Sequence, residues 1–132
     1  MNRTANLAVL FASLADPTRL RLLNLIAGRE VCVCFLVEIL RQSQPKISRH
    51  LAYLRRAGIV TARREGKWMH YRLAKPADPG AAAILASTLR SLREDRNMQA
   101  DVSRLERACC APRPLIQLQG APRPAAVSSR LH

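Results

Sequence analysis

Aromatic residues are scarce in this chain, at 4% of its 132 residues, so its core must be built mainly from aliphatic side chains. No stretch reaches the roughly 18 apolar residues of a membrane-spanning helix, and we expect no membrane partner. The carboxylates are scattered, and neither a Gly-rich phosphate loop nor a Ser/His/Asp arrangement occurs. These absences argue against an enzyme. The length supports one compact domain with flanking segments.

Acidic residues are also few, since 9 Asp and Glu face 22 Lys and Arg and leave a net charge of +13. The excess is concentrated in residues 41–75, where Glu65 is the single acid among ten basic residues. Charge this dense is typical of a surface that neutralises nucleic-acid phosphates. A solvated basic surface and a non-specific RNA-binding protein are the alternatives that charge alone leaves open.

Apolar periodicity predicts a mainly α-helical chain with one small β-hairpin. Helices are expected over five segments: residues 3–14, 17–28, 31–41, 45–57 and 79–107. Asp16 and Pro17 form a strong start for the second helix, because Asp caps exposed N–H groups and Pro suits the first turn. Residues 59–73 alternate in polarity around Gly66, which predicts the hairpin. This order of elements is that of a winged helix-turn-helix.

Polar and apolar residues separate on the predicted fourth helix. At about 100° per residue, Ile47, Leu51 and Leu54 share one face and are expected to meet the core. The helix start and its opposite face carry the candidate DNA contacts, which are Ser43, Gln44, Lys46, Ser48, Arg49, Tyr53 and Arg56. Arginine can pair with guanine through two hydrogen bonds, and N–H groups at a helix start attract phosphate. The hairpin tip adds Arg63, Arg64 and Lys67, which suit the DNA backbone or minor groove.

Three separated motifs carry a family resemblance. Asp16–Arg19 (DPTR), Gln44–Leu51 (QPKISRHL) and Gly66–Leu73 (GKWMHYRL) closely resemble, in order, the arsenic-repressor (ArsR/SmtB) family. The resemblance implies a repressor that binds double-stranded operator DNA as a homodimer through its first and last helices. The domain would span residues 1–107. Residues 108–132 hold Cys109–Cys110 and then four prolines without an acid, and we expect a disordered tail there.

The four cysteines form two close pairs, Cys32 with Cys34 and Cys109 with Cys110. The first pair matches the Cys-Val-Cys signature of arsenite-responsive family members. The resemblance therefore implies arsenite or antimonite as inducer, and trivalent arsenic and antimony are soft centres that prefer thiolates. Val37 stands where a third cysteine often occurs, so Cys109, Cys110, an external thiol or no third ligand all remain open. No cofactor is required.

The spacing of the first pair suggests a release mechanism. On an ideal helix Cys32 and Cys34 would point about 200° apart, so inducer binding is predicted to unwind the start of the third helix and displace the fourth. A zinc or cadmium site on the last helix is not expected, because residues 80–107 contain no histidine. A redox or persulfide sensor of the same fold is the nearest rival.

We expect a cytoplasmic protein with reduced thiols. Residues 2–16 carry one Arg and an apolar run, a pattern that superficially resembles a signal peptide. Leu7, Leu10 and Leu14 fall at helical spacing, however, which favours an amphipathic first helix.

Overall fold

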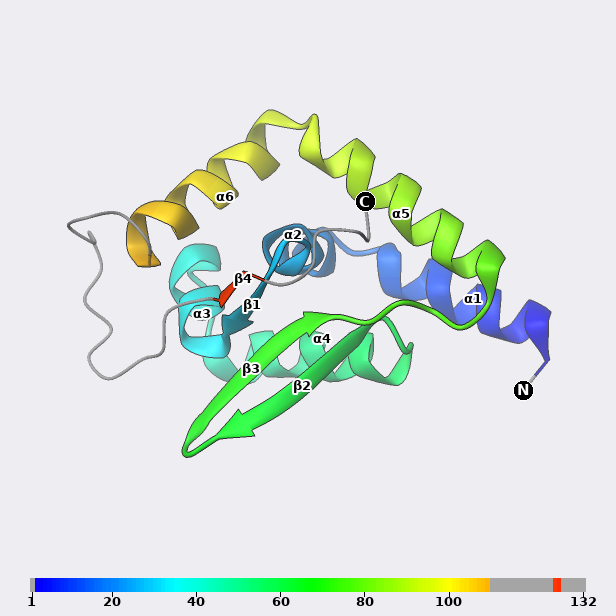
Figure 1. Cartoon of the computed structure of the whole chain (residues 1–132), viewed down its shortest axis with the longest axis horizontal. Coiled ribbons are helices and arrows are strands. Elements are labelled where there is room, and N and C mark those ends of the chain that lie inside the picture. Colours follow the sequence, from blue (N-terminus) through cyan, green and yellow to red (C-terminus); the bar gives the residue numbers. More distant parts are fainter. Residues whose placement is uncertain (1, 110–124, 127–132) are drawn as a thin grey trace.

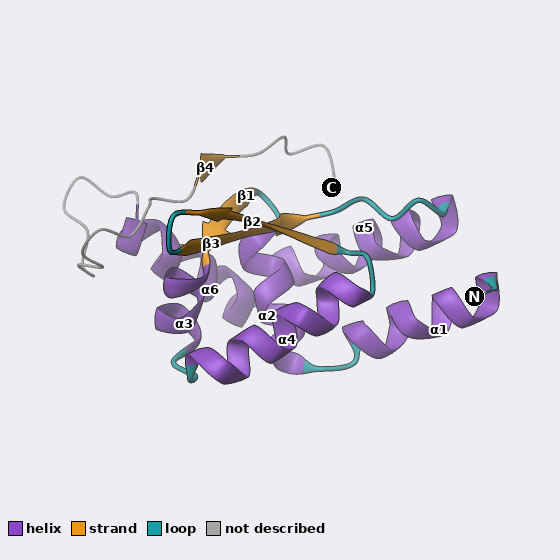
Figure 2. Ribbon diagram, turned by 90° about the horizontal axis from the view of Figure 1, so that it is seen from below, coloured by secondary structure: helices purple, strands orange, loops and turns teal. Residues whose placement is uncertain are grey.

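The computed structural model describes residues 2–109 and 125–126, and these residues form helices covered on one side by a small antiparallel sheet (Figures 1 and 2). In chain order the elements are α1 (Arg3–Leu14), α2 (Pro17–Ile26), β1 (Arg29–Cys32), α3 (Val33–Leu40), α4 (Gln44–Arg56), β2 (Val60–Glu65), β3 (Trp68–Leu73), α5 (Pro79–Arg93), α6 (Arg96–Cys109) and β4 (Ala125–Ala126). The strands lie in the sheet in the order β2-β3-β1-β4. The predicted mainly helical fold with a β-hairpin is confirmed.

Side-chain caps fix where several helices begin. Asn2, Asp16, Ser43 and Asp78 each accept a hydrogen bond from the backbone N–H three residues further along. Such caps satisfy N–H groups that a helix start would otherwise leave unpaired. α2, α4 and α5 also have proline in the first turn, where its missing N–H costs nothing. The sequence therefore predicted the start of α2 from Asp16 and Pro17 and the start of α4 from Ser43.

The helix α2 lies at the centre of the molecule and packs against all five other helices (Figure 1). The core is aliphatic, as the low aromatic content predicts, and its largest fully buried residues include Leu22, Leu23, Ile26, Leu36 and Leu54. On α4, the side chains of Ile47, Leu51 and Leu54 are all 0% exposed. The predicted core-facing side of this helix is therefore confirmed, and it fixes which side of α4 faces solvent.

The strand β1 was not predicted. The third helix was expected from residue 31, but residues 29–32 form a strand and α3 begins only at Val33. β1 pairs with β3, with Val31 opposite Tyr71 and Cys32 opposite His70. The sheet therefore joins the hairpin, called the wing below, to the segment that carries the first cysteine pair.

The predicted single helix over residues 79–107 is wrong, because two helices, α5 and α6, occupy this region. The break lies at Glu94 and Asp95. The Asp95 carboxylate accepts hydrogen bonds from the N–H groups of Asn97 (2.8 Å) and Met98 (3.1 Å) and so starts the second helix. The chain bends at this point, and α6 packs against α2 and α3 (Figure 1).

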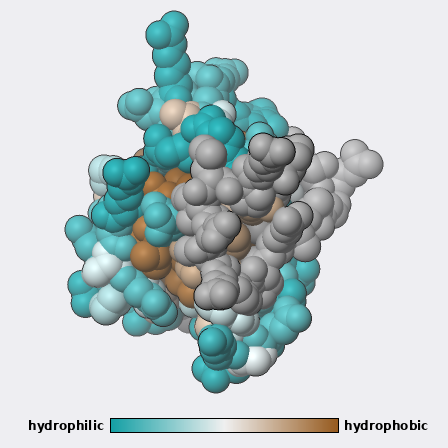
Figure 3. Space-filling model, turned by 90° about the vertical axis from the view of Figure 1, so that its left-hand side faces the viewer, coloured by the Kyte–Doolittle hydropathy of each residue, from teal (hydrophilic) through white to brown (hydrophobic). Residues whose placement is uncertain are grey.

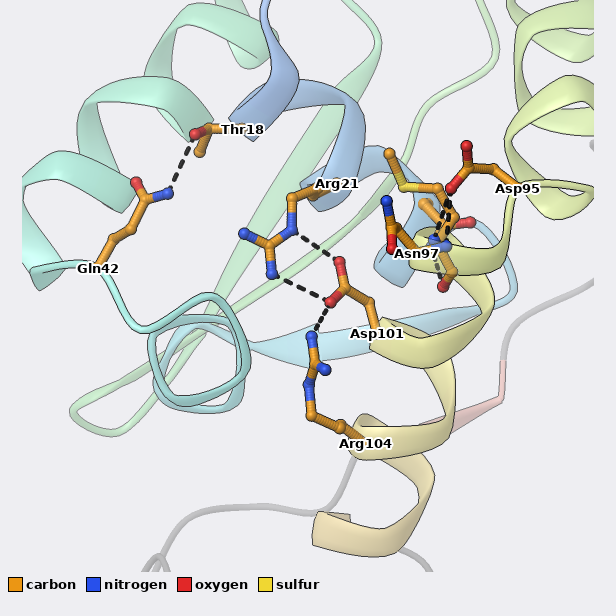
Figure 4. Close-up of polar contacts among 9 residues, drawn as sticks. Thr18, Arg21, Gln42, Asp95, Asn97, Asp101 and Arg104 are labelled. Carbon is orange, nitrogen blue, oxygen red and sulfur yellow. Dashed lines mark hydrogen bonds and ion pairs between the residues drawn. The ribbon is translucent and has the colours of Figure 1, made fainter.

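A buried carboxylate holds α6 against α2 (Figure 4). Asp101 is 2% exposed and accepts two hydrogen bonds from Arg21, at 2.7 Å and 3.0 Å, and one from Arg104. These hydrogen bonds to Asp101 raise the pKa of Arg21. Nearby, the Asn24 side-chain amide donates to the Met98 carbonyl at 3.0 Å. The second half of the C-terminal helical region is therefore fixed by polar contacts as well as by its apolar face.

The surface is largely hydrophilic, but an apolar area shows at the end where α3 and α6 lie (Figure 3). None of the described helices combines the length and apolarity needed to cross a bilayer. Cys110 and most of the segment predicted to be a disordered tail lie outside the described residues. Within that segment, Ala125–Ala126 pair with Arg29 and Glu30 of β1.

Candidate nucleic-acid interface and cysteine site

The solvent-facing side of α4 carries the residues predicted to contact DNA. Ser43, Gln44, Lys46, Arg49 and Arg56 are exposed, while Ser48 and Tyr53 are half-buried. Because the opposite face of α4 is fully buried, these polar groups form one continuous open surface. The geometry suits insertion of a helix into a major groove. The structure confirms where these side chains lie, and their contact with DNA stays a prediction.

Arg19 is a part of this surface that the sequence analysis did not single out. Its guanidinium lies 4.2 Å from the centroid of the Tyr53 ring, and that of Arg56 lies 5.8 Å away. Arg19 also donates to the carbonyls of Ser13 (2.8 Å) and Ala12 (3.0 Å) at the end of α1. Because these contacts of Arg19 join α1, α2 and α4, the sequence could not predict them. The sequence pointed to Arg19 only through its place in the Asp16–Arg19 motif.

His50 lies on the same side of the molecule but faces Arg19. Its Nδ1 is 3.3 Å from Nη1 of Arg19 and 3.8 Å from the Asp16 carboxylate. Burial lowers the pKa of His50, and the positive charge of Arg19 acts in the same direction, against the opposing effect of Asp16. The neutral ring can then accept a hydrogen bond from Arg19.

The wing turns at Gly66, whose φ of 60° lies in the left-handed region that glycine tolerates. Of the three basic residues predicted at its tip, Arg64 and Lys67 are exposed, and Lys67 lies 5.1 Å from the Trp68 ring centroid. Arg63 differs, because it donates to Glu30 at 2.8 Å and to Glu65 at 3.1 Å. These hydrogen bonds raise the pKa of Arg63. All three basic side chains are therefore exposed, but the guanidinium of Arg63 is engaged by two carboxylates of the protein.

The cysteine pair has a geometry that the sequence analysis did not predict. Cys32 is the last residue of β1 and the N-cap of α3, with an extended backbone (ψ 141°), and Cys34 lies in the first turn of α3. The two sulfurs are 2.9 Å apart. The prediction that they point in opposite directions is wrong, because it assumed that Cys32 is helical. No unwinding of α3 is needed to bring the two sulfurs together.

The contact between the two thiols shifts their pKa values in opposite directions. A hydrogen bond from Cys34 lowers the pKa of Cys32 to about 7, although burial opposes the shift, and the backbone N–H groups of Cys34 and Val33 add to it. The same hydrogen bond raises the pKa of Cys34. Cys32 is fully buried and Cys34 half-buried. The pair is therefore poised to present one thiolate near neutral pH beside a second thiol.

The sequence analysis left open which group, if any, acts as a third ligand beside Cys32 and Cys34. No group of three His, Cys, Asp or Glu that could hold a metal ion occurs within residues 2–109 or 125–126. Cys109 is buried at the end of α6, where it is disulfide-bonded and lies 3.9 Å from Nη1 of Arg29. Its role as a ligand stays a prediction that would require this bond to be reduced. Cys110 lies outside the described residues.

The arrangement of α3, α4 and the basic wing defines a winged helix-turn-helix DNA-binding protein. Residues 16–62 match the family model "Bacterial regulatory protein, arsR family". The chain is 47% identical over 103 residues to the arsenical resistance operon repressor of Escherichia coli (strain K12), covering 77% of this chain and 86% of that protein. The chain therefore belongs to the arsR family and is a transcriptional repressor rather than an enzyme.

Solved structures agree with this assignment. HlyU from Vibrio cholerae N16961 is similar with a TM-score of 0.59 and 32% identity, covering 69% of this chain and 97% of that one. The AntR antimony-specific transcriptional repressor is similar with a TM-score of 0.54 and 33% identity, covering 69% of this chain and 80% of that one. The predicted family and fold are confirmed.

Proposed function

We propose that this repressor leaves its operator when trivalent arsenic or antimony binds the thiolates of Cys32 and Cys34. The observation that carries the proposal is the 2.9 Å separation of the two sulfurs, which already face one another. The lowered pKa of Cys32 supplies a thiolate, the species that binds a soft centre. Similar proteins are named for arsenical resistance and for antimony-specific repression, which supports the choice of inducer.

Binding would replace hydroxide on the arsenic or antimony by sulfur, and each displaced hydroxide would leave as water with the proton of one thiol. The sulfurs of Cys32 and Cys34 lie 2.9 Å apart at the start of α3, so both could bind the same arsenic or antimony atom. An external thiol, Cys109 or Cys110 could complete the coordination, and two protein sulfurs alone could hold the inducer. Since the sulfurs meet without unwinding of α3, the coupling to DNA release must follow another route.

Operator binding as a homodimer completes the proposal. The start of α1 lies beside the start of α5, where Arg3 and Asp78 form an ion pair at 3.2 Å. Phe11 on α1 is 54% exposed, and a shallow groove of about 480 Å³ includes the apolar Ile84 and Leu92 of α5. A second copy would cover these surfaces, which supports pairing through α1 and α5. Two copies would place two α4 helices on neighbouring half-sites of double-stranded DNA in the cytoplasm.

The test uses a duplex selected from a random DNA pool by the wild-type protein. Its binding is followed by fluorescence anisotropy during an arsenite titration. The Cys32→Ser/Cys34→Ser variant should keep its DNA affinity and ignore arsenite. The matched variant Cys109→Ser/Cys110→Ser should still be released by arsenite, and a need for more arsenite than the wild type would assign the third ligand to that pair. Normal release of the first variant would place the sensor elsewhere and overturn the proposal.

Redox sensing is a second candidate, favoured by the same short contact between the sulfurs. A peroxide could take two electrons from the Cys32 and Cys34 thiols, so that a disulfide forms and the peroxide is reduced to water. Parallel titrations of the DNA complex with arsenite and with hydrogen peroxide separate the candidates. Release by arsenite under reducing conditions supports the first, and release by peroxide alone supports the second.

A further inference from the structure

The strand that carries the cysteine pair is also the strand on which the wing is built. β1 contains both Glu30 and Cys32, and it pairs with β3, the second strand of the wing, so that Cys32 lies directly opposite His70. Side chains at such positions are about 4.5–5.5 Å apart at Cβ. The register therefore places the cysteine site one strand away from the wing.

A second connection joins the same strand to the far side of the wing. Arg63 of β2 donates to Oε1 of Glu30 from Nε (2.8 Å), and its Nη2 lies 2.6 Å from the same oxygen. This pair, called the Glu30–Arg63 clasp below, spans β3, because β3 lies between β1 and β2 in the sheet. The clasp therefore connects the outer strand of the wing to the strand that carries Cys32.

The burial of Glu30 makes the clasp stronger than a surface ion pair. The Glu30 side chain is 10% exposed, whereas that of Arg63 is 51% exposed. A nearly buried carboxylate depends on its partner, because few water molecules can replace a lost hydrogen bond. His70 of β3 lies near both carboxylates that bind Arg63. Its Nδ1 is 4.0 Å from Glu30, and its Nε2 is 3.4 Å from Glu65 without forming a hydrogen bond.

We propose that the Glu30–Arg63 clasp positions the wing for DNA binding, and that inducer binding at Cys32 and Cys34 releases DNA by loosening the clasp. The positioning of the wing concerns DNA affinity and is argued from the contacts alone. The release of DNA by the inducer rests on the proposed function. Glu30 and Cys32 are two residues apart on a four-residue strand, so a shift of the Cys32 sulfur on ligand binding moves the strand that holds Glu30.

The clasp gives Arg63 a role opposite to the one predicted from the sequence. If Arg63 contacted phosphate, Glu30 would restrain it, and loss of the Glu30 charge would strengthen DNA binding. If Arg63 positions the wing, loss of that charge weakens DNA binding. The sign of the change therefore separates the two roles.

The experiment measures operator affinity for the wild type, Glu30→Gln, Arg63→Gln and the double variant at several salt concentrations. Glu65→Gln is the matched control. Glu65 also forms an ion pair with Arg63, but it lies within the wing and does not connect the wing to β1. We expect each clasp variant to weaken binding by about three- to tenfold, the double variant to be no weaker than either single one, and the control to change little. Arg63→Gln leaves the nearly buried Glu30 carboxylate without its partner, whereas Glu30→Gln removes that charge, so Glu30→Gln decides the sign of the effect even if Arg63→Gln does not fold.

Salt dependence gives a second readout that a general loss of stability would not move. A phosphate contact contributes about 0.9 to the slope of log affinity against log salt. The clasp predicts the same slope in Glu30→Gln and Arg63→Gln, because both variants disturb the same wing contacts. A slope lower by about one in Arg63→Gln alone, tighter binding by Glu30→Gln, or a further loss in the double variant would each overturn the positioning role.

The regulatory part is tested by the ratio of operator affinities without and with arsenite. In Glu30→Gln this ratio should shrink severalfold, while arsenite binding to the DNA-free protein, measured by calorimetry, stays unchanged. An unchanged ratio would show that release does not pass through the clasp. If wild-type protein binds no arsenite, the proposed function fails, and the affinity measurements still decide whether Glu30 positions the wing.

Discussion

Arg19, in the first turn of α2, stacks on the ring of Tyr53 in α4, with 4.2 Å between the guanidinium and the ring centroid. The same guanidinium donates to two carbonyls at the end of α1, those of Ala12 and Ser13. One side chain therefore connects the end of α1, the start of α2 and the solvent-facing side of α4. If α1 pairs with a second copy, Arg19 also connects the dimer contact to the helix predicted to read DNA.

Replacing Arg19 by Ala should weaken operator binding by about 1–2 kcal/mol, because Tyr53 loses a cation–π partner and α1 loses two hydrogen bonds at its end. Arg19→Lys should recover only part of this loss, since lysine lacks the planar group that makes these contacts together. Anisotropy titrations against the selected duplex measure the change. Arg96→Ala, at the exposed start of α6, is the control and should bind normally. Equal affinities for all four proteins would refute the supporting role.

Arg49 is the exposed arginine in the middle of α4, and its side chain makes no hydrogen bond or ion pair with the described residues. Arg49→Ala should weaken operator binding by about 1–3 kcal/mol if the side chain reads a base. Selection of preferred duplexes by the variant should then show relaxed preference at one position in each half-site. A variant that loses affinity equally for all sequences would instead mark Arg49 as a phosphate contact.

Local signals in the sequence were enough for much of this fold. The caps at Asp16 and Ser43, the apolar side of α4 formed by Ile47, Leu51 and Leu54, and the alternation around Gly66 each lie within one element. Caps, helix faces and tight turns are set by neighbouring residues. The helix-turn-helix and the wing were therefore predictable without knowledge of tertiary contacts.

The cysteine site was predictable in its residues but not in its geometry. β1 has only four residues, and its pairing with β3 joins Cys32 to His70, which lies far along the chain. Short strands that are buried on both sides show no alternation to distinguish them from a helix start. The contacts of Glu30 with Arg63 are equally non-local. The break at Asp95, by contrast, had a local signal, because Asp is a common N-cap residue.

The acidity of Cys32 gives a prediction about pH. Its pKa is lowered to about 7, while that of Cys34 is raised above its usual range, so one thiolate should form as the pH rises through about 7. The ultraviolet absorbance of the thiolate, taken as the difference between wild type and Cys32→Ser, follows this step. Cys34→Ala removes the hydrogen-bond donor and should move the midpoint upward, towards the ordinary thiol value. An unchanged midpoint in Cys34→Ala would show that Cys34 does not stabilise the thiolate.

The buried Asp101 predicts a stability difference between two ion pairs of α6. Asp101→Asn removes the charge that holds Arg21 and Arg104, and breaking a buried pair costs about 3–5 kcal/mol. The two arginines are partly exposed and can regain water, so we expect about 2–3 kcal/mol here. The control is Glu106→Gln, whose carboxylate is 54% exposed and lies 3.5 Å from Arg29, and it should cost less than about 1 kcal/mol. Urea unfolding of both variants measures the difference, and similar losses would mean that Asp101 does not anchor α6.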